Sequence, residues 1–584
     1  MNPRPLLPGA GWLALLAATV PALIAFNEPP SSTLYNQAAA AVLWGLFVAW
    51  STAGAAAQPG SRWGAPRALW PLALPLLLLA GAALASSVWG QLPITLGRLS
   101  ALSLLGALVM VAAGWAAVAR GQGRVLPAVF AAWLLAGVLS TAIGVVQVFA
   151  PEWADGNFIA RTGLLGRAVG NLRQPNHLSS LLLWSAIAVV PLLEARRLPR
   201  VAAGLLMAFM VFGITLSGSR TGLVGMAVLT LWGLLDGRLQ RPARGVLLAV
   251  PLMFAASWAV MTYWAGQTAK TFGAALHMAA GGDISSSRFG IWRDTLSLIR
   301  MHPGSGVGWG EFNFAWSLTP FPQRPVAFFD HTHNLPLQLA VELGLPLAAL
   351  VLALLAWALW QAGRRSLQVP GAEGAGVRAA FMMVLMMALH SQLEYPLWYL
   401  YFLLPTAWAW GACLGAGQPE AAARTASPAA RRPALLLPAA GLLTMVLGLA
   451  AMQDYRGVVV IYAPPADASP LSQRIRLGQD AWLFGHQADY AAATTTDQPG
   501  LLMPAVQRSA HNLLDTRLMI AWARAYAQQG DLERARHLAD RLREFRNPNS
   551  DEFFAECQDP KREPKPFQCT PSRLPLDWRD FRAP

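Results

Sequence analysis

The chain has 584 residues, of which 55% are hydrophobic and only 13% are charged, and it contains 24 tryptophans. This composition argues against a soluble protein and fits a polytopic membrane protein with tryptophans at the bilayer surfaces. The formal net charge of +14 lies largely in short loops between apolar segments. We therefore interpret it as a signal of membrane topology, which makes the lipid bilayer, and not nucleic acid, the expected partner.

Thirteen apolar segments have the length of about 20 residues that a membrane-spanning helix requires. Their centres lie near residues 17, 44, 76, 109, 137, 186, 208, 228, 256, 348, 384, 406 and 443. The first segment, Gly9–Phe26, lacks a convincing cleavage site, so we expect a transmembrane helix there and not a signal peptide. The sequence thus predicts an all-α polytopic membrane protein with about 13 transmembrane helices.

The distribution of arginine between the loops predicts the orientation of the chain. With the N-terminus in the cytoplasm, the cytoplasmic side carries 17 basic residues and the short loops on the other side carry five. The 17 are Arg4, Arg62, Arg67, Arg120, Arg124, Arg196, Arg197, Arg200, Arg238, Arg241, Arg244, Arg364, Arg365, Arg378, Arg424, Arg431 and Arg432, and the five are Arg98, Arg161, Arg167, Arg173 and Arg220. The positive-inside rule then places the longest loop and the C-terminal tail in the periplasm.

We divide the chain accordingly into N-terminal transmembrane helices (1–265), a large periplasmic loop (266–333), C-terminal transmembrane helices (334–453) and a periplasmic α-helical domain (454–584). Within this last domain, Leu518–Phe545 resembles the helix–turn–helix of a tetratricopeptide repeat. Cys557 and Cys569 lie close together in the same domain. They form a disulfide if the tail is outside the cytoplasm, and two free thiols are the alternative.

Two of the outward-facing loops carry polar residues that topology does not explain. The segment 170–177 contains Arg173, Gln174, Pro175 and Asn176. We expect Pro175 to fix the backbone and Asn176 to cap the next helix, but neither role requires an arginine and a glutamine beside the membrane. In the segment 217–222, Arg220 is either a snorkelling side chain in a tight turn or a ligand for an anion.

Two further outward-facing loops complete this set. In the large loop, Arg288 and Trp292 are four residues apart and share one helical face, as they also would in an amphipathic helix at the membrane surface. Arginine binds phosphate bidentately at any relevant pH, so arginines from separate loops suit a pyrophosphate group. In the fourth loop, Glu394 and Tyr395 lie near the bilayer, where a carboxylate needs a function or a salt bridge to one of the outer arginines.

The large loop ends at the segment 330–336, which contains His331 and His333 just before an apolar helix. Imidazole has a pKa of about 6.5 and can take up or release a proton at ambient pH. A helix start explains Thr332 or Asn334 as a cap, but it needs no histidine. Metal binding by an aspartate and both histidines is the second alternative. The glycine-rich segment 304–310 lacks the lysine of a P-loop, and we interpret it as loop structure.

These motifs together resemble the O-antigen ligase and polymerase superfamily of bacterial inner membranes, and within it the protein O-oligosaccharyltransferases of the PglL type. The shared pattern is His333, Asn334, nine residues and Gly344, at the end of the large loop. Arg220, between Ser219 and Thr221, and Arg288 match the two arginines of the family. The segments 170–177 and 394–397 and the C-terminal extension resemble the protein-glycosylating branch more than the lipopolysaccharide ligases.

The resemblance implies a membrane glycosyltransferase of GT-C type. Such an enzyme takes a glycan from an undecaprenyl-pyrophosphate carrier and transfers it to a serine or threonine hydroxyl of a periplasmic acceptor protein such as a pilin. The alternatives are an O-antigen ligase that acts on lipid A-core, an O-antigen polymerase and, in a different class, a lipid-glycan transporter.

The residues of the expected site then take distinct roles. His333 is the general base, and Arg220 and Arg288 hold the pyrophosphate and stabilise charge on the leaving group. We expect an inverting, metal-independent transfer without a cofactor. The substrate-binding set is Arg173, Gln174, Asn176, His331, Asn334, Glu394 and Tyr395.

Overall fold

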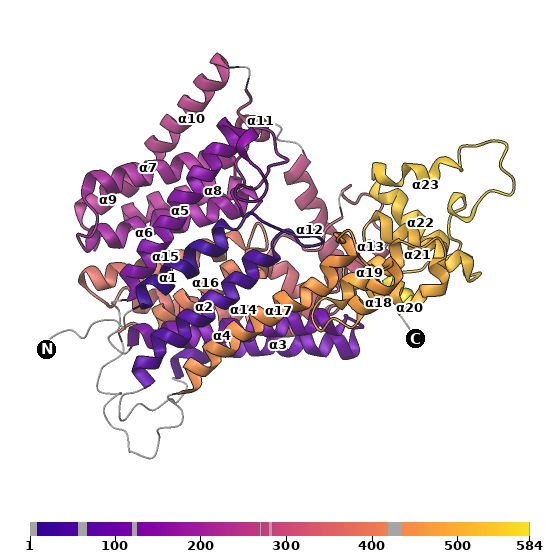
Figure 1. Ribbon diagram of the computed structural model, residues 1–584, viewed down its shortest axis with the longest axis horizontal. Coiled ribbons are helices and arrows are strands. Elements are labelled where there is room, and N and C mark those ends of the chain that lie inside the picture. Colours follow the sequence, from indigo (N-terminus) through magenta and orange to yellow (C-terminus); the bar gives the residue numbers. More distant parts are fainter. Residues whose placement is uncertain are drawn as a thin grey trace. The chain divides into compact units, whose positions relative to one another are not determined.

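The computed structural model describes residues 9–56, 67–119, 125–268, 270–279, 283–326, 328–417 and 435–582, and within these ranges every regular element is a helix (Figure 1). The chain forms two compact units, each built from several stretches of sequence. The first unit comprises Met1–Leu76, Leu105–Gly281 and Leu354–Met452, and the second comprises Leu77–Leu104, Gly282–Ala353 and Gln453–Pro584.

Nine helices among the described residues are long and apolar enough to cross a membrane. They are α3 with its preceding 3-10 turn (Arg67–Trp89), α4 (Ile94–Ala119), α5 (Val125–Phe149), α6 (Pro175–Glu194), α7 (Arg200–Ser217), α9 continued by α10 (Arg241–Gln267), α14 (Leu335–Ser366), α15 (Gly371–His390) and α17 (Leu436–Tyr462). The shorter apolar helices are α1 (Ala10–Leu23), α8 (Arg220–Leu235) and α16 (Leu400–Gly415). The chain is therefore a polytopic membrane protein, as its composition predicts.

Each of the thirteen predicted segments contains a helix, because α2 (Leu34–Ala56) accounts for the segment centred near residue 44. Seven of the basic residues on which the predicted orientation depends lie outside the described residues: Arg4, Arg62, Arg120, Arg124, Arg424, Arg431 and Arg432. The orientation of the chain and the number of 13 spans stay predictions.

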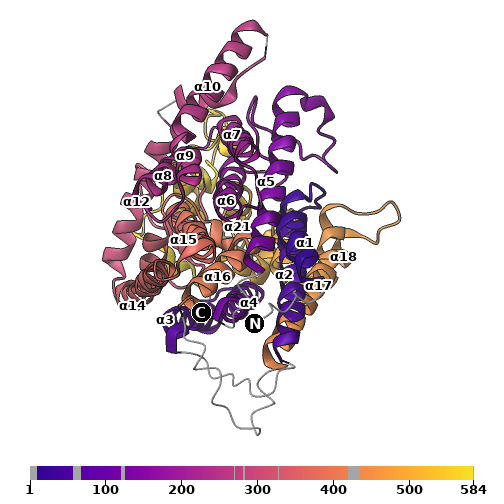
Figure 2. The same ribbon diagram turned by 90° about the vertical axis from the view of Figure 1, so that its left-hand side faces the viewer.

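Helix α6 is the central helix of the first unit, and it begins directly after the polar segment 170–174. Almost every side chain of α6 is buried. It packs against α5, α7, α8 and α15, and two views of the ribbon show it among these helices (Figure 2). A helix that is apolar on all sides needs such surroundings, so the segment that precedes α6 is attached to a deeply buried helix of this unit.

The second unit joins the large loop to the C-terminal tail. The loop contributes α12 (Asp283–Met301) and α13 (Phe312–Leu318). The tail contributes α18 (Leu471–Gln479), α19 (Gly485–Thr494), α20 (Met503–Ala510), α21 (Thr516–Gln528), α22 (Leu532–Phe545) and α23 (Asp551–Ala555). Phe314 and Trp316 of the loop and Trp522 and Phe545 of the tail are members of one buried hydrophobic cluster. The sequence suggests a separate tail domain, whereas the structure gives loop and tail a common core.

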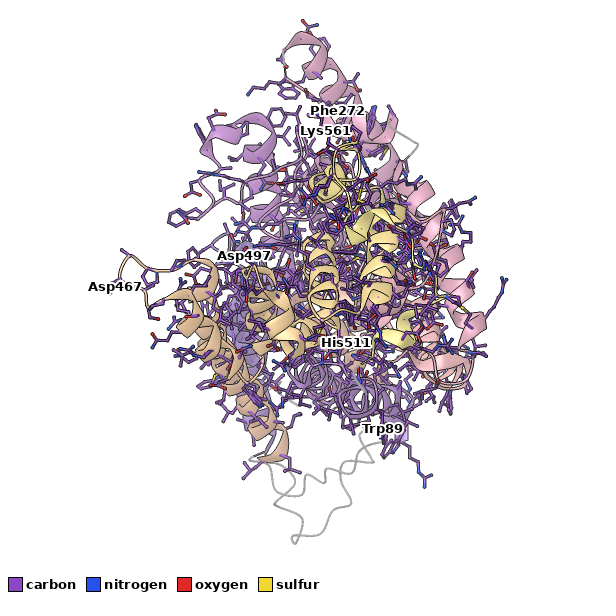
Figure 3. The ribbon with its side chains drawn as sticks, turned by 90° about the vertical axis from the view of Figure 1, so that its right-hand side faces the viewer. Trp89, Phe272, Asp467, Asp497, His511 and Lys561 are labelled. Carbon is purple, nitrogen blue, oxygen red and sulfur yellow. A yellow bond between two sulfur atoms is a disulfide. The ribbon has the colours of Figure 1, made fainter. Side chains whose placement is uncertain are left out.

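Buried polar contacts reinforce this common core. Arg324 is fully buried, donates to Glu544 Oε2 from Nε at 3.1 Å, and lies over the ring of Phe545 at 4.5 Å. His511, which follows α20 and is labelled in Figure 3, contacts Glu311 Oε2 at 2.7 Å through Nδ1. Burial raises the pKa of Glu311, and the neighbouring imidazole counteracts this shift. Both pairs join loop to tail, so the buried polar groups of each segment would lose hydrogen-bond partners without the other segment.

Helix α14 is interrupted at Gly344, where φ is 75° and ψ is 163°. A Cβ atom at this position would lie 2.2 Å from the carbonyl oxygen of Gly304. The glycine-rich segment runs alongside the interruption, because Val307 N donates to Val341 O at 2.8 Å and Leu345 N donates to Pro303 O at 2.8 Å. The segment 304–310 is thus structural, and Gly344, the last residue of the His–Asn–Gly pattern, allows its close approach.

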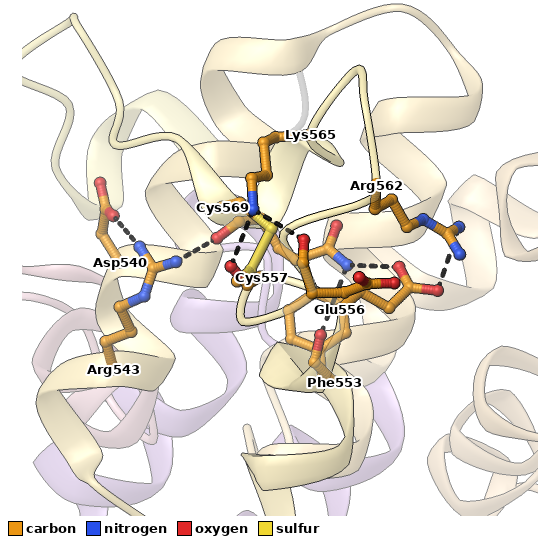
Figure 4. The surroundings of a disulfide bond; sticks show 10 residues. Asp540, Arg543, Phe553, Glu556, Cys557, Arg562, Lys565 and Cys569 are labelled. Atoms are coloured by element: carbon orange, nitrogen blue, oxygen red, sulfur yellow. Dashed lines mark hydrogen bonds and ion pairs between the residues drawn. A yellow bond between two sulfur atoms is a disulfide. The ribbon is translucent and has the colours of Figure 1, made fainter.

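The two cysteines of the tail form a disulfide, which is the first of the two alternatives (Figure 4). Cys557 and Cys569 are 5.2 Å apart between Cα atoms. The loop that they close is held further by an ion pair of 3.1 Å between Arg562 and Glu556, and by Lys565 Nζ, which donates to Cys557 O at 3.2 Å. The third cysteine, Cys413, is buried in α16.

Candidate functional site

His333 has an unusual backbone conformation, with φ at +54°. Residues other than glycine rarely occupy this left-handed region, and when they do, the surrounding structure holds them there. Thr332, directly before it, is fully buried. Its N–H donates to Gln338 Oε1 at 2.7 Å, and its carbonyl oxygen accepts from Trp292 Nε1 at 2.9 Å. These contacts fix the direction in which the His333 side chain leaves the chain.

The two histidines of the motif have different neighbours. His331 Nδ1 lies 3.0 Å from Asp330 Oδ1, whereas the ring of His333 packs edge-to-face against Phe329 at 5.4 Å. Burial acts to raise the pKa of Asp330, but the charge and the hydrogen bond of His331 outweigh it and lower this pKa to about 2. Asp330 is therefore a carboxylate at neutral pH and pairs with His331, while His333 stands against an aromatic ring.

The start of α14 accounts for the other residues of the motif. Asn334 Oδ1 accepts from Leu337 N at 3.0 Å, so Asn334 caps the helix. Thr332 Oγ1 donates to Asn334 O at 2.8 Å. One turn into the helix, Gln338 Nε2 donates to Glu342 Oε1 at 2.8 Å. The requirements of a helix start thus explain Thr332 and Asn334, as one alternative expects.

Arg288 and Trp292 lie on α12, one helical turn apart, as their spacing predicts. The indole of Trp292 donates to the backbone directly before His333. Arg288 is half-buried on the same helical face. Within the second unit, Arg288 therefore lies one helical turn from the residue that contacts the segment carrying His333.

In the first unit, the residue that caps α6 is Gln174 and not Asn176, which corrects our expectation. Gln174 Oε1 accepts from His177 N at 2.7 Å, and the backbone of Gln174 is extended, with φ at −143°. The cause is Pro175, which occupies the first helical position and forces the preceding residue into an extended conformation. Asn176 lies within the first turn of the helix, and its side chain is available for another task.

That task is a hydrogen-bond chain between three loops. Asn176 Nδ2 donates to Glu394 Oε1 at 3.0 Å, and Asn176 Oδ1 accepts from Ser219 Oγ at 2.6 Å. Ser219 Oγ also accepts from Gly222 N at 3.0 Å and so caps α8. Arg220 is the first residue of α8. The chain from Glu394 to Ser219 consequently fixes the turn from which the Arg220 side chain emerges.

Arg173 is held by protein acceptors in the described structure. It donates to Ser32 O at 3.0 Å, to Asn27 Oδ1 at 2.8 Å and to Ala25 O. Like His333 it has a positive φ, of 58°. Its guanidinium thereby attaches the segment before α6 to the connection between α1 and α2, so Arg173 has a structural role here.

Tyr395 belongs to an aromatic cluster beside Asn176. Its ring stacks on Tyr399 at 6.1 Å, and the ring of Tyr399 lies 4.6 Å from His177. His177 Nδ1 in turn lies 3.0 Å from Tyr401 Oη. His177 and Tyr401, both buried, were not singled out from the sequence; their polar atoms in apolar helices were the only signal that could have indicated them.

The structure thus brings the predicted residues together in two groups. Gln174, Asn176, Glu394, Tyr395 and Arg220 belong to the first unit. Arg288, His331, His333 and Asn334 belong to the second. Their roles toward a substrate stay predictions.

Three segments of the chain match models of known families. Residues 168–193 match the family described as "Protein glycosylation ligase", and residues 205–352 match "O-Antigen ligase". Residues 378–558 match "Virulence factor membrane-bound polymerase, C-terminal". The first two segments contain Gln174, Asn176, Arg220, Arg288 and His333.

Two curated proteins of Acinetobacter baylyi (strain ATCC 33305 / BD413 / ADP1) are similar to this chain. A "General O-oligosaccharyltransferase" is 30% identical over 272 residues, and a "ComP-specific O-oligosaccharyltransferase" is 25% identical over 269 residues. Each match covers 44% of this chain and 45% of the relative, so it spans less than half of either protein. Residues 168–193 and 205–352 of this chain are thus similar to protein glycosylation ligases and to O-antigen ligases, and the two relatives are O-oligosaccharyltransferases.

Proposed function

We propose that the protein is an O-oligosaccharyltransferase, which moves a complete glycan from an undecaprenyl-pyrophosphate carrier to serine or threonine hydroxyls of periplasmic proteins such as a pilin. The observation that carries this proposal is the preformed left-handed conformation of His333 next to the Trp292–Thr332 contact. Strained backbone of this kind concentrates where a side chain must be held ready for chemistry. The names of the two relatives support the same activity.

In the proposed reaction, His333 accepts the proton of the acceptor hydroxyl while the oxygen of that hydroxyl attacks the anomeric carbon of the glycan. The bond between that carbon and the pyrophosphate oxygen breaks, and the electron pair leaves with the undecaprenyl pyrophosphate. A direct displacement of this kind inverts the anomeric configuration. General-base assistance typically contributes about 10²–10⁴-fold in rate.

The leaving group gains charge in the transition state, and arginine suits its stabilisation. We assign this role to Arg220 and Arg288, because both match arginines of the resembled family. Gln174, Asn176, Glu394 and Tyr395 position the glycan or the acceptor, and His331 supports His333 through its pair with Asp330.

The proposal places this chemistry in the periplasm, with a cytoplasmic N-terminus. Two features support this side: the excess of arginine in the opposite loops, and the disulfide of the tail, since disulfides persist in the periplasm and are rare in the cytoplasm. A protein acceptor is supported by the match of residues 168–193, and a lipid A-core acceptor by the "O-Antigen ligase" match of residues 205–352.

The test is to express the full chain with a lipid-linked glycan in bacterial cells that lack other ligases, and to search by mass spectrometry for the glycan. We expect it on serine or threonine of a co-expressed pilin. Glycan found on lipid A-core instead would replace the protein acceptor by the ligase alternative. Glycan that stays on its carrier in cells with correctly inserted protein would refute the transferase.

A further inference from the structure

Three backbone segments of the first unit meet at unusually short range beside the start of α8. Ala168 N donates to Leu216 O at 3.1 Å, and Gly273 N donates to Gly166 O at 3.1 Å. Cβ atoms would collide at this junction: one on Gly166 would lie 2.2 Å from Thr271 O, and one on Gly218 would lie 2.8 Å from Ala274 Cα. Glycine at these positions therefore allows the loop before α6, the turn between α7 and α8, and helix α11 (Gly273–Ala279) to pack together.

Each of the three segments carries one basic side chain at the junction. Arg167 comes from the first, Arg220 from the second and His277 from the third. Arg167 Nε donates to Ser217 O at 3.0 Å and its Nη2 donates to Gly218 O at 3.4 Å, which anchors it to the α7–α8 turn. All three side chains are half-buried, so each keeps part of its surface accessible to a ligand.

These side chains repel one another electrostatically. Burial lowers the pKa of Arg167 and the charge of Arg220 lowers it further. Burial likewise lowers the pKa of His277, followed by the charges of Arg167 and Arg220. Within the described part of the chain no carboxylate forms an ion pair with any of the three, and the Arg220 guanidinium has no hydrogen-bond acceptor there. A bound anion would relieve this repulsion.

Membrane topology does not explain the cluster either. Arginines that fix orientation gather in the cytoplasmic loops, whereas Arg167 and Arg220 are two of the five basic residues expected in the short loops on the opposite side. Cations that three separate segments bring near one another suit a phosphate group, which accepts charge-assisted hydrogen bonds.

We propose that Arg167, Arg220 and His277 form a subsite for the diphosphate of the glycan donor, in which His277 is the member that titrates. The identity of the donor rests on the proposed function, but the assignment of Arg167 and His277 rests on the junction itself. Arg220 provides a guanidinium that has no hydrogen-bond acceptor among the described residues, and Arg167 provides the N–H groups that the turn does not use. His277 adds a third positive charge when it is protonated.

The sign of the pH dependence follows from this arrangement. Without a ligand, burial and then the charges of the two arginines keep the pKa of His277 below its ordinary value, so the imidazole is largely neutral at pH 7.5. A bound dianion raises the same pKa, and binding therefore takes up a proton. The affinity for diphosphate accordingly increases as the pH falls through this range and stays constant once His277 is protonated in both states.

The experiment measures binding of inorganic pyrophosphate and of undecaprenyl diphosphate to the full chain in nanodiscs of a zwitterionic lipid, at pH 6.0 and pH 7.5. We expect tighter binding at pH 6.0, and an affinity about tenfold lower for His277→Gln at that pH, which is typical for the loss of one charged hydrogen bond. His277→Lys should bind tightly at both pH values. Lys270→Gln, which removes an exposed charge seven residues away, is the matched control and should behave as wild type.

Three outcomes decide the proposal. Unchanged affinity and pH dependence in His277→Gln would overturn it. Loss of diphosphate binding when the nanodiscs contain phosphatidylglycerol would also overturn it, because the cluster would then be a site for phospholipid headgroups. Loss of pH dependence in His277→Gln with retention in Lys270→Gln would support it. Binding can be measured without glycan transfer, so the two proposals fail separately. If the protein transfers glycan but substitution of His277 does not change binding, only this inference is wrong. If binding depends on the cluster but no glycan is transferred, only the proposed function is wrong.

Discussion

At the scale of single residues, the left-handed backbone of His333 allows its catalytic role to be tested by a substitution that keeps the local backbone conformation. Asparagine tolerates this conformation better than most residues and has no group that accepts a proton near neutral pH. We expect His333→Asn to fold and insert as wild type but to lose transfer by about 10²–10⁴-fold. His331→Asn is the matched control and should lose much less. Transfer at the wild-type rate by purified His333→Asn would rule out the general base.

Arg288 gives a second test at this scale. A planar guanidinium forms two parallel hydrogen bonds to phosphate, which an ammonium group cannot do. We expect Arg288→Lys to keep the charge and the fold but to lower kcat/KM with lipid-linked glycan by at least about tenfold. The same substitution at Arg293, five residues along α12, should have little effect on transfer. Equal activity of both lysine variants would show that Arg288 serves only as a charge that influences membrane topology.

Ser219 is a positioning residue, because its hydroxyl caps α8 and bonds to Asn176. Replacing an N-cap serine by alanine typically costs about 0.5–2 kcal/mol. We expect Ser219→Ala to lower the thermal midpoint and to raise KM for the donor more than it lowers kcat, since the Arg220 turn loosens. Ser219→Thr, which keeps the hydroxyl, should rescue both. A donor KM that Ser219→Ala leaves unchanged would argue that the cap does not position Arg220.

The candidate site could be predicted from the sequence only where the signal is local. His333 before a helix, Asn334 as a cap, and Arg288 one turn from Trp292 all follow from short spacings. The partners of Arg173 could not be foreseen, because Ala25 and Ser32 lie more than 140 residues away in sequence. Local reasoning also chose Asn176 as the cap of α6 in place of Gln174, because it gave too little weight to Pro175 at the first helical position.

At the scale of elements, the interruption of α14 is a feature that one substitution can test. Gly344 adopts a backbone conformation that L-residues avoid, and a Cβ would meet Gly304 O. We expect Gly344→Ala to destabilise the protein by at least about 1–3 kcal/mol, seen as a lower thermal midpoint in detergent. Gly457, in helical backbone of α17 with open space around it, is the control, and its alanine variant should be neutral or slightly stabilising. Equal midpoints for the two variants would contradict the assigned role of Gly344.

The helices themselves were the most predictable part of the fold. Length and hydropathy decide whether a segment spans a membrane, and every predicted centre falls within a helix. The break in α14 was less predictable, since it depends on a backbone segment that arrives from 40 residues earlier. Hydropathy carries no information about such a contact.

At the scale of the whole molecule, the buried pair of Arg324 and Glu544 tests whether loop and tail fold together. Removing one partner of a buried ion pair typically costs about 3–5 kcal/mol. We expect Glu544→Ala to make both the large loop and the tail susceptible to protease at the same time, because Arg324 loses its counter-ion in their common core. Glu552→Ala, at an exposed position of α23, should leave the digestion pattern unchanged. Cleavage of the tail alone would show that the two fold separately.

No pattern in the sequence indicates this common core. Glu311 and His511 are 200 residues apart, and four membrane-spanning segments predicted from hydropathy lie between the loop and the tail. Each segment by itself reads as a polar stretch with some aromatic residues. Their mutual burial appears only when the chain is folded.

The shared core of loop and tail also limits how this chain can be recombined with its relatives. A hybrid that takes its tail from one protein and its loop from another would place foreign residues around Trp316, Arg324 and Glu311, each of which has a partner in the tail. Segments of the large loop and of the tail therefore form one structural module that is encoded in two separate places along the chain. A hybrid keeps the buried contacts of this core only when both places change together.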